Sequence, residues 1–159
     1  MTSNIHSGLQ GRSVVITGGA QGIGQACARR LVRDGAAVAL WDTADAPGQA
    51  LAEELAKAGA RAIYQHCNVA HKADVDAALA ATVAALGPVH GLVNNAGIFR
   101  AAEFLEITEA DWDAVIGVNL KGSFLVGQAV ARGVAAAGRR AIVNMGSVNG
   151  SLAIASIAS

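Results

Sequence analysis

A closely spaced set of glycines near the N-terminus is the first feature whose residues could do chemistry. Residues 17–24 read TGGAQGIG and directly follow a short apolar run. Glycine allows a tight turn and a close approach to a ligand, and free N–H groups at the start of a following helix attract phosphate oxygens. The segment therefore fits a pyrophosphate-binding loop, while a tight strand-to-helix turn without a ligand would use the same glycines. The residues that we expect at the ligand are Gly18, Gln21, Gly22, Ile23 and Gly24.

A carboxylate, Asp42, follows the next apolar run at residues 37–41. At the end of a second strand, it can accept hydrogen bonds from both hydroxyls of an adenosine ribose. The same charge would repel a 2′-phosphate, and no arginine follows immediately to offset it. Asp42 therefore favours NAD as the cofactor over NADP. The alternative is that Asp42 only starts the following loop as an Asx turn.

Small or polar residues also follow the third, fourth and fifth apolar runs. In a parallel sheet these positions share one edge with the glycine segment, and small residues there leave room for an adenosine. The residues that we expect to line its site are Asn68, Val69, Asn95, Ala96 and Gly97. Ser147 follows the fifth run, and its hydroxyl could hydrogen-bond a substrate carbonyl or the alkoxide formed from it. Serine in a loop also serves ordinary turns, so its position alone leaves both roles open.

These residues need a scaffold in which short strands alternate with helices. Apolar runs predict buried strands at residues 13–17, 37–41, 62–66, 91–94 and 141–145. Segments of helical period predict helices at residues 23–34, 47–58, 73–86 and 108–137. Because strand–helix–strand crossovers are right-handed in nearly all proteins, the expected fold is α/β, a doubly wound parallel sheet of Rossmann type. We expect residues 1–159 to form a single dinucleotide-binding domain.

The motifs together resemble the short-chain dehydrogenase/reductase family from Leu9 onward. The family's TGxxxGxG motif corresponds to residues 17–24, and its NNAG motif corresponds to residues 94–97. The resemblance implies that Ser147 is the catalytic serine and that Asn119, within Val-Asn-Leu-Lys-Gly, holds a water in a proton relay. Without the resemblance, Asn119 would be interpreted as a solvent-facing polar residue within the last predicted helix.

The resemblance also implies an activity. Asn68 stands where family members often carry an aspartate facing the adenine amino group, and its amide oxygen can still accept from that group. The expected protein is an NAD(H)-dependent alcohol dehydrogenase or ketoreductase that moves a hydride between the nicotinamide and a ketone or secondary alcohol, and forms a homo-oligomer, either a dimer or a tetramer. The family's Tyr-x-x-x-Lys motif would begin just beyond Ser159, so we expect a C-terminally incomplete domain that is inactive alone. The alternative is a non-catalytic dinucleotide-binding module or a truncated product.

Composition and charge argue against several other classes of protein. Twelve basic and twelve acidic side chains cancel, so no long-range field recruits nucleic acid or an anionic membrane. Polar residues interrupt the uncharged segment 141–159, which argues against a membrane span. Cys27 and Cys67 form no disulfide framework and the histidines have no metal-ligand spacing, so we expect a cytoplasmic protein without a metal. A P-loop NTPase is excluded because no Gly-Lys-Ser/Thr follows the glycines, and the matches at residues 94–97 and Ser147 disfavour a methyltransferase.

Overall fold

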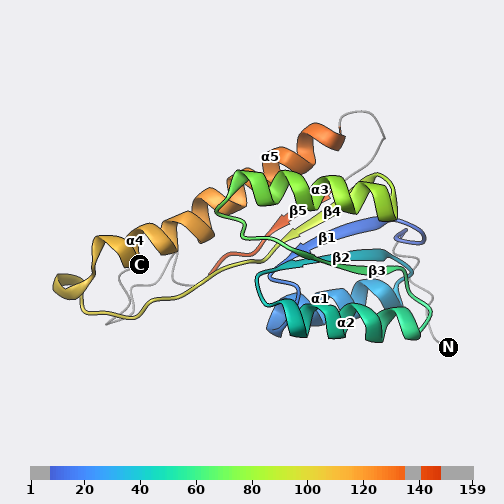
Figure 1. Ribbon diagram of the computed structural model, residues 1–159, viewed down its shortest axis with the longest axis horizontal. Helices are drawn as coiled ribbons and strands as arrows, with labels where there is room; N and C mark the ends of the chain where they lie inside the picture. The colour runs from blue at the N-terminus through green and yellow to red at the C-terminus, as the bar shows by residue number, and fades with distance from the viewer. Residues whose placement is uncertain (1–7, 135–140, 148–159) are drawn as a thin grey trace.

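A parallel sheet forms the centre of the structure (Figure 1), a computed structural model that describes residues 8–134 and 141–147. Its strands are β1 (Ser13–Thr17), β2 (Ala37–Asp42), β3 (Ala62–His66), β4 (Val89–Asn94) and β5 (Ala141–Asn144). They lie in the order β3-β2-β1-β4-β5, and every neighbouring pair is parallel. The chain winds outward from β1 in both directions, so the connections after β1 and β4 leave on opposite sides and open a crevice between them. The predicted α/β, doubly wound sheet is confirmed.

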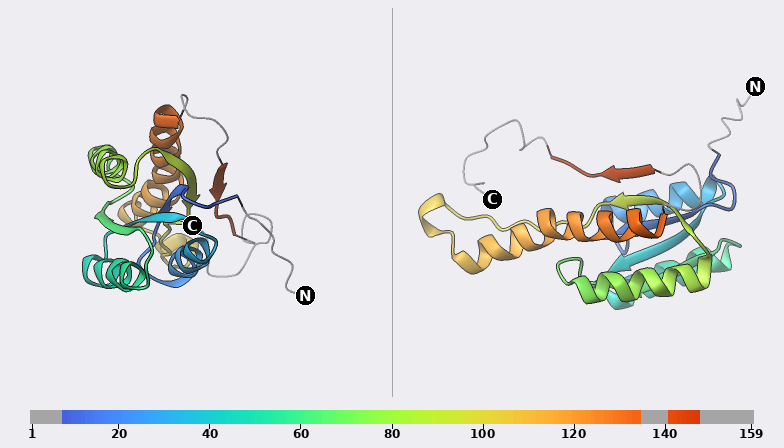
Figure 2. Two further views of the ribbon diagram at one scale, coloured as in Figure 1. Left: turned by 90° about the vertical axis from the view of Figure 1, so that its right-hand side faces the viewer. Right: turned by 90° about the horizontal axis from the view of Figure 1, so that it is seen from above.

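Helices cover both faces of this sheet (Figure 2). They are α1 (Gly22–Arg33), α2 (Asp45–Lys57), α3 (Lys72–Leu86), the short turn η1 (Phe104–Glu106), α4 (Glu109–Ile116), the π-helical turn η2 (Gly117–Gly122) and α5 (Ser123–Val134). One face is covered by α1 and α2, and the other by α3 and α5. The continuous helix Glu109–Arg132 is long and apolar enough to cross a bilayer. Its Val126 and Val130 are buried in the core beside the sheet.

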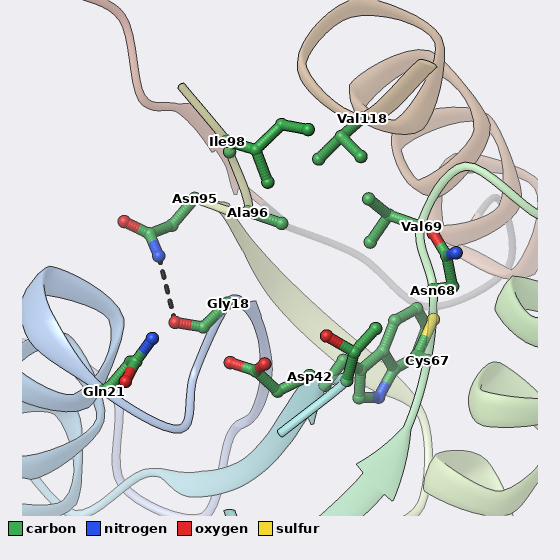
Figure 3. Close-up of a pocket in the computed structure, with 13 residues that line it drawn as sticks. Gly18, Gln21, Asp42, Cys67, Asn68, Val69, Asn95, Ala96, Ile98 and Val118 are labelled. Carbon is green, nitrogen blue, oxygen red and sulfur yellow. Dashed lines mark hydrogen bonds between the residues drawn. The ribbon is translucent and has the colours of Figure 1, made fainter. Parts of the chain in front are cut away.

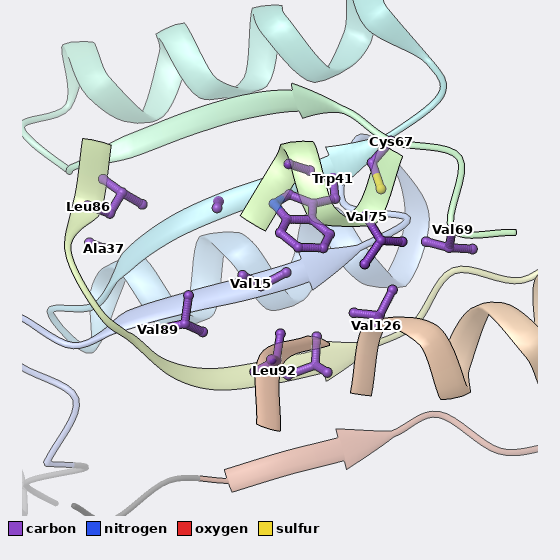
Figure 4. Packing of buried hydrophobic residues seen from close by; sticks show 13 residues of the cluster. Val15, Ala37, Trp41, Cys67, Val69, Val75, Leu86, Val89, Leu92 and Val126 are labelled. Carbon is purple, nitrogen blue, oxygen red and sulfur yellow. The ribbon is translucent and has the colours of Figure 1, made fainter. Parts of the chain in front are cut away.

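Alternate residues of the central strands point to opposite layers. On β1, Val15 packs with α3 and α5, whereas Ile16 packs with α1 and α2. Figure 4 shows the first of these clusters, in which Trp41 of β2 lies among residues that include Val75 of α3 and Val126 of α5. Because both faces of β1 and β2 are covered, these strands are apolar at consecutive positions rather than alternating with polar residues.

All five predicted strands and the helices that follow them are confirmed, and most differences lie at their ends. For example, β4 begins at Val89 instead of Gly91, because its pairing with β1 continues across a register shift. The predicted helix 108–137 starts as expected, where Thr108 Oγ1 accepts a hydrogen bond from the backbone N–H of Asp111 at 3.1 Å. The sequence did not indicate the π-helical turn η2 inside this helix, and the predicted helix end lies outside the described residues.

The buried indole of Trp41 depends on a single described acceptor. Its Nε1–H donates to Thr82 Oγ1 at 3.0 Å, and the Thr82 hydroxyl donates to the carbonyl of Ala78. The change Thr82→Val keeps the side-chain shape but leaves the indole N–H without this acceptor. We expect the free energy of unfolding, measured by urea denaturation, to fall by about 1–3 kcal/mol, the cost of an unsatisfied buried donor. Val83→Thr, at an exposed position of the same helix, should change it by less than about 0.5 kcal/mol. A Thr82→Val protein as stable as the wild type would contradict this account of the core.

Candidate functional site

A cavity of about 310 Å³ opens at the carboxyl ends of β1 to β4, beside the crevice between β1 and β4 (Figure 3). The predicted site residues in its lining are Gly18, Gln21, Asp42, Asn68, Val69, Asn95, Ala96 and Gly97. Five further lining residues were not predicted from the sequence, namely Trp41, Thr43, Cys67, Ile98 and Val118. Each of these is a sequence neighbour of a predicted site residue, so the signal that could have found them was adjacency to a motif.

Three glycines of the loop after β1 meet separate physical requirements. Gly18 adopts a φ of 62°, and its N–H donates to the carbonyl of Trp41 at 2.8 Å. Gly22 adopts a φ of 54°, a left-handed conformation that side chains disfavour. A Cβ atom on Gly24 would come within 2.0 Å of the carbonyl oxygen of Gly18. The loop can therefore fold tightly against β2 and the start of α1 only with glycine at these positions.

The first turn of α1 is open to an anionic ligand. This helix begins at Gly22, and the side chain of its N-cap residue Gln21 makes no capping hydrogen bond. No acidic side chain lies in the first turn, and Ile23 is 62% exposed. The N–H groups and the positive end of the helix dipole thus face solvent next to the cavity, where a phosphate could bind them.

The Asp42 carboxylate is held from two sides. Its Oδ2 accepts from the backbone N–H of Ala20 in the glycine loop at 3.0 Å, and its Oδ1 accepts from the backbone N–H of Ala44 at 3.0 Å. The second bond is an Asx turn, so the structural alternative for Asp42 is realised while the carboxylate still lines the cavity. Each oxygen keeps a lone pair for a further donor. Among the described lining residues none is lysine or arginine, so the charge of Asp42 has no cation beside it within the cavity wall.

The cavity wall beyond β3 is formed by Asn68 and Val69. Asn68 Oδ1, which we expected to face an adenine amino group, accepts from the backbone N–H of Ala70 at 3.1 Å and keeps its second lone pair for a ligand. The buried Val69 is backed by Gly122 of η2, where a Cβ atom would come within 2.7 Å of Val69 Cγ2. Burial and, secondarily, Asp74 raise the pKa of the Cys67 thiol to about 12, so Cys67 contributes a neutral, unreactive wall.

A buried hydrogen-bond network joins the loops after β1 and β4. The Thr17 hydroxyl oxygen accepts from the backbone N–H groups of Asn95 and Ala96, each at 2.9 Å. The Asn95 carboxamide donates to the carbonyls of Thr17 at 3.0 Å and Gly18 at 3.1 Å. Asn94 donates to the carbonyl of Ser123 and to Asn144 Oδ1 at 3.1 Å, which extends the network to β5. Asn95 therefore lines the cavity and also holds the glycine loop in place.

Asn119 lies in η2 and is exposed, but its carboxamide is not merely solvated. Asn119 Oδ1 accepts from the backbone N–H of Ile98 at 2.8 Å, and its Nδ2 donates to the carbonyl of Ile98 at 2.9 Å. The side chain is exposed, as the alternative of a solvent-facing residue expects, and it also fastens the segment after Gly97 to the helix. The carbonyl of Asn119 accepts from Ser123 Oγ at 2.8 Å, as part of this non-standard helical turn.

Ser147 follows β5 on the same edge of the sheet as the cavity. The Met145 N–H donates to the carbonyl of Asn94 at 3.0 Å, so the chain stays beside β4 as it leaves the strand. Ser147 is exposed and does not belong to the described cavity lining. Gly22, Ile23, Gly24 and Asn119 also lie outside that lining, although Gly24 and Asn119 position residues within it.

The doubly wound sheet, with a glycine loop and an open helix start at its switch point, defines a Rossmann-type α/β domain. A family model described as short chain dehydrogenase matches residues 12–159, and the chain belongs to the short-chain dehydrogenase/reductase family. This confirms the resemblance predicted from its motifs.

Individual relatives agree with this assignment. A (2S)-[(R)-hydroxy(phenyl)methyl]succinyl-CoA dehydrogenase subunit from Thauera aromatica is 42% identical over 77% of this chain and 50% of its own length. A Burkholderia phymatum short-chain dehydrogenase/reductase solved with NAD superposes with a TM-score of 0.91 at 32% identity, covering 94% of this chain and 53% of that one. A Burkholderia cenocepacia gluconate 5-dehydrogenase solved with NADP and tartrate superposes with a TM-score of 0.88 at 41% identity. The match covers 94% of this chain and 59% of that one. The chain spans little more than half the length of these proteins.

The contact between Gly24 and Gly18 gives a direct test of the loop. In Gly24→Ala the new methyl group must displace the Gly18 carbonyl or the Asn95 carboxamide, since it would lie 2.0 Å from the first and 2.8 Å from the second. We expect dinucleotide affinity, measured by calorimetry, to fall at least about tenfold. Gly127→Ala is the matched control, because a Cβ atom there meets nothing within 4 Å. Unchanged affinity in Gly24→Ala, or equal losses in both variants, would contradict this function for the loop.

Proposed function

We propose that this chain forms the NAD(H)-binding part of an oxidoreductase that moves a hydride between the nicotinamide and a carbonyl compound or secondary alcohol. The observation that carries the cofactor preference is Asp42, which points a carboxylate into the cavity without a lysine or arginine among the described lining residues. The oxidoreductase class follows from membership of the family. Bound in the cavity, the dinucleotide would supply the hydride.

The described residues fit the parts of a dinucleotide. The open start of α1 and the glycine loop suit a pyrophosphate, because both offer backbone N–H groups without a competing acid. The Asp42 carboxylate suits the vicinal hydroxyls of an adenosine ribose, since each oxygen can accept one more hydrogen bond. Asn68 and Val69 suit the adenine, with an apolar wall and an amide at its edge.

NAD and NADP are the two candidate cofactors for this site. One relative was solved with NAD and another with NADP, so members of the family bind both. A 2′-phosphate would stand next to Asp42 in a wall that offers it no described cation. The 41% identity to the gluconate 5-dehydrogenase solved with NADP does not outweigh this, because selection at this point depends on one or two side chains rather than on overall similarity. NAD is therefore the cofactor that the site favours.

Ser147 and Asn119 are the proposed contributors to the chemical step. The Ser147 hydroxyl would hydrogen-bond the substrate oxygen, and Asn119 would hold a water in a proton relay. Tyr64, the chain's one tyrosine, is unsuited as the acid because its hydroxyl is bonded to Asp45 and the Asp42 carbonyl and because burial raises its pKa. A polypeptide of these 159 residues should therefore bind dinucleotide without turnover. The non-catalytic binding module remains the second candidate function.

Calorimetric titration of the full encoded protein with NAD and NADP tests the cofactor preference. We expect NAD to bind at least about tenfold more tightly, as one charged hydrogen-bonding contact gives. Asp42→Ala should narrow the difference, chiefly by removing the repulsion of the 2′-phosphate. Asp113→Ala removes an exposed carboxylate on α4, outside the cavity, and should leave the difference unchanged. Equal affinities of the wild type for the two cofactors would contradict the preference.

Ser147→Ala in the full encoded protein tests the proposed chemical step. We expect kcat to fall by roughly 10²–10³, as for the loss of one preorganised hydrogen-bond donor to a developing alkoxide. The dissociation constant for NAD should stay within about twofold, because Ser147 does not line the described cavity. If kcat changed little, or if the loss were confined to cofactor binding, Ser147 would have no role in the chemistry.

A further inference from the structure

A cluster of three side chains lies on the side of the β2–α2 turn that the proposed function does not use. Tyr64 and His66 come from β3, and Asp45 is the first residue of α2. Tyr64 Oη lies 2.6 Å from Asp45 Oδ1 and 2.7 Å from the backbone oxygen of Asp42. His66 Nδ1 lies 2.7 Å from the same Asp45 oxygen. One phenol thus contacts both ends of the turn that carries Asp42.

Packing contacts hold the Tyr64 ring and thereby fix the direction of its hydroxyl. A Cβ atom on Gly48 would come within 2.3 Å of Tyr64 Cδ2 and Cε2, so the ring rests directly on the backbone of α2. The pairing of β2 with β3 places Tyr64 opposite Leu40, and the ring packs against the core cluster between the sheet and α2. The hydroxyl therefore reaches the turn from a ring held by both strand and helix.

The protonation states of the cluster define donor and acceptor. Burial and the neighbouring Asp45 raise the pKa of Tyr64, and hydrogen bonds from Tyr64 and His66 lower the pKa of Asp45. At neutral pH the phenol is consequently a donor whose single proton lies between the Asp45 carboxylate and the Asp42 carbonyl. The Asp42 carbonyl also accepts from the Cys67 N–H at 2.9 Å, which ties the turn to the end of β3.

We propose that Tyr64 is a positioning residue for cofactor selection. Its hydroxyl closes the β2–α2 turn and so holds the Asp42 carboxylate where it accepts the ribose hydroxyls and repels a 2′-phosphate. Within the described part of the chain, the Asp42 carboxylate is held by the N–H groups of Ala20 and Ala44, and Tyr64 supports it by holding the Asp42 backbone carbonyl. The inference rests on the proposed preference for NAD.

The test uses two changes that remove the same contact in different ways. Tyr64→Phe keeps the ring on Gly48 and deletes the hydroxyl, whereas Gly48→Ala keeps the hydroxyl and displaces the ring. In the full encoded protein, each should narrow the ratio of the NADP to the NAD dissociation constant by about three- to tenfold, the scale of one hydrogen bond. The kcat at saturating NAD should change little. The double variant should narrow the ratio no further than either single change, because both act through one contact.

Ser13→Ala is the matched control, since it deletes a buried hydroxyl bonded to the Pro88 carbonyl at the opposite end of β1 from the cavity. It should leave the affinity ratio unchanged. If Gly48→Ala yields no folded protein, Tyr64→Phe decides, because it removes only the hydroxyl oxygen and keeps the ring on Gly48. A wild type without preference for NAD would overturn the proposed function together with this inference. If the wild type prefers NAD, three results would overturn only the function of Tyr64. Both single variants could keep the full affinity ratio, Ser13→Ala could reduce this ratio equally, or the double variant could reduce it additively.

Discussion

The hydroxyl of Thr17 joins the two loops that leave the sheet in opposite directions. A doubly wound sheet opens a crevice only because its chain departs from β1 toward one face and from β4 toward the other, and such a split exposes backbone donors at its base. Thr17 Oγ1 accepts from two of them, at Asn95 and Ala96, while the Asn95 carboxamide satisfies the carbonyls of Thr17 and Gly18. The crevice therefore has a polar base whose donors and acceptors are paired with one another by hydrogen bonds.

Everything that we assign to cofactor recognition is built outward from that base. Gly18 is held by Asn95, and Gly24 has no side chain and so leaves space for the Gly18 carbonyl, which brings the start of α1 next to the cavity. Asp42 then links the same loop to the β2–α2 turn through Ala20. The start of α1 therefore lies beside the cavity, and the Asp42 carboxylate lies in the cavity wall. The first suits a pyrophosphate, and the second suits uncharged ribose hydroxyls.

Local sequence was sufficient for most of this arrangement. Consecutive apolar residues in β1 and β2 indicated strands with two covered faces, and the glycine spacing indicated the loop. Asp42 was predicted either to contact a ligand or to start an Asx turn. The Asx turn is present and the residue also lines the cavity, so its contact with a ligand stays a prediction. The resemblance to a family implied a catalytic function for Ser147. Its position in the sequence alone left both a catalytic hydroxyl and an ordinary turn residue open.

Contacts between distant segments could not be obtained in the same way. The hydrogen bonds between Asn119 and Ile98 join a helix to a loop, and the packing of the Tyr64 ring on Gly48 joins a strand to a helix. Neither contact leaves a pattern in the local sequence, because each depends on two backbone segments whose separation is set by the packing of the sheet. The π-helical turn η2 is of this kind as well, since Gly122 fits against Val69 only once the helix lies across the end of β3.

A crystal structure of the full encoded protein with NAD would show whether Asp42 and the start of α1 bind the cofactor. We expect both adenosine ribose hydroxyls within about 2.7–3.2 Å of the Asp42 carboxylate, with the pyrophosphate at the first turn of α1. We also expect Asp42 to keep its bonds to Ala20 and Ala44, since each carboxylate oxygen has a further lone pair for a ribose hydroxyl. A dinucleotide bound elsewhere on the molecule, or bound here with its ribose turned away from Asp42, would contradict this expectation.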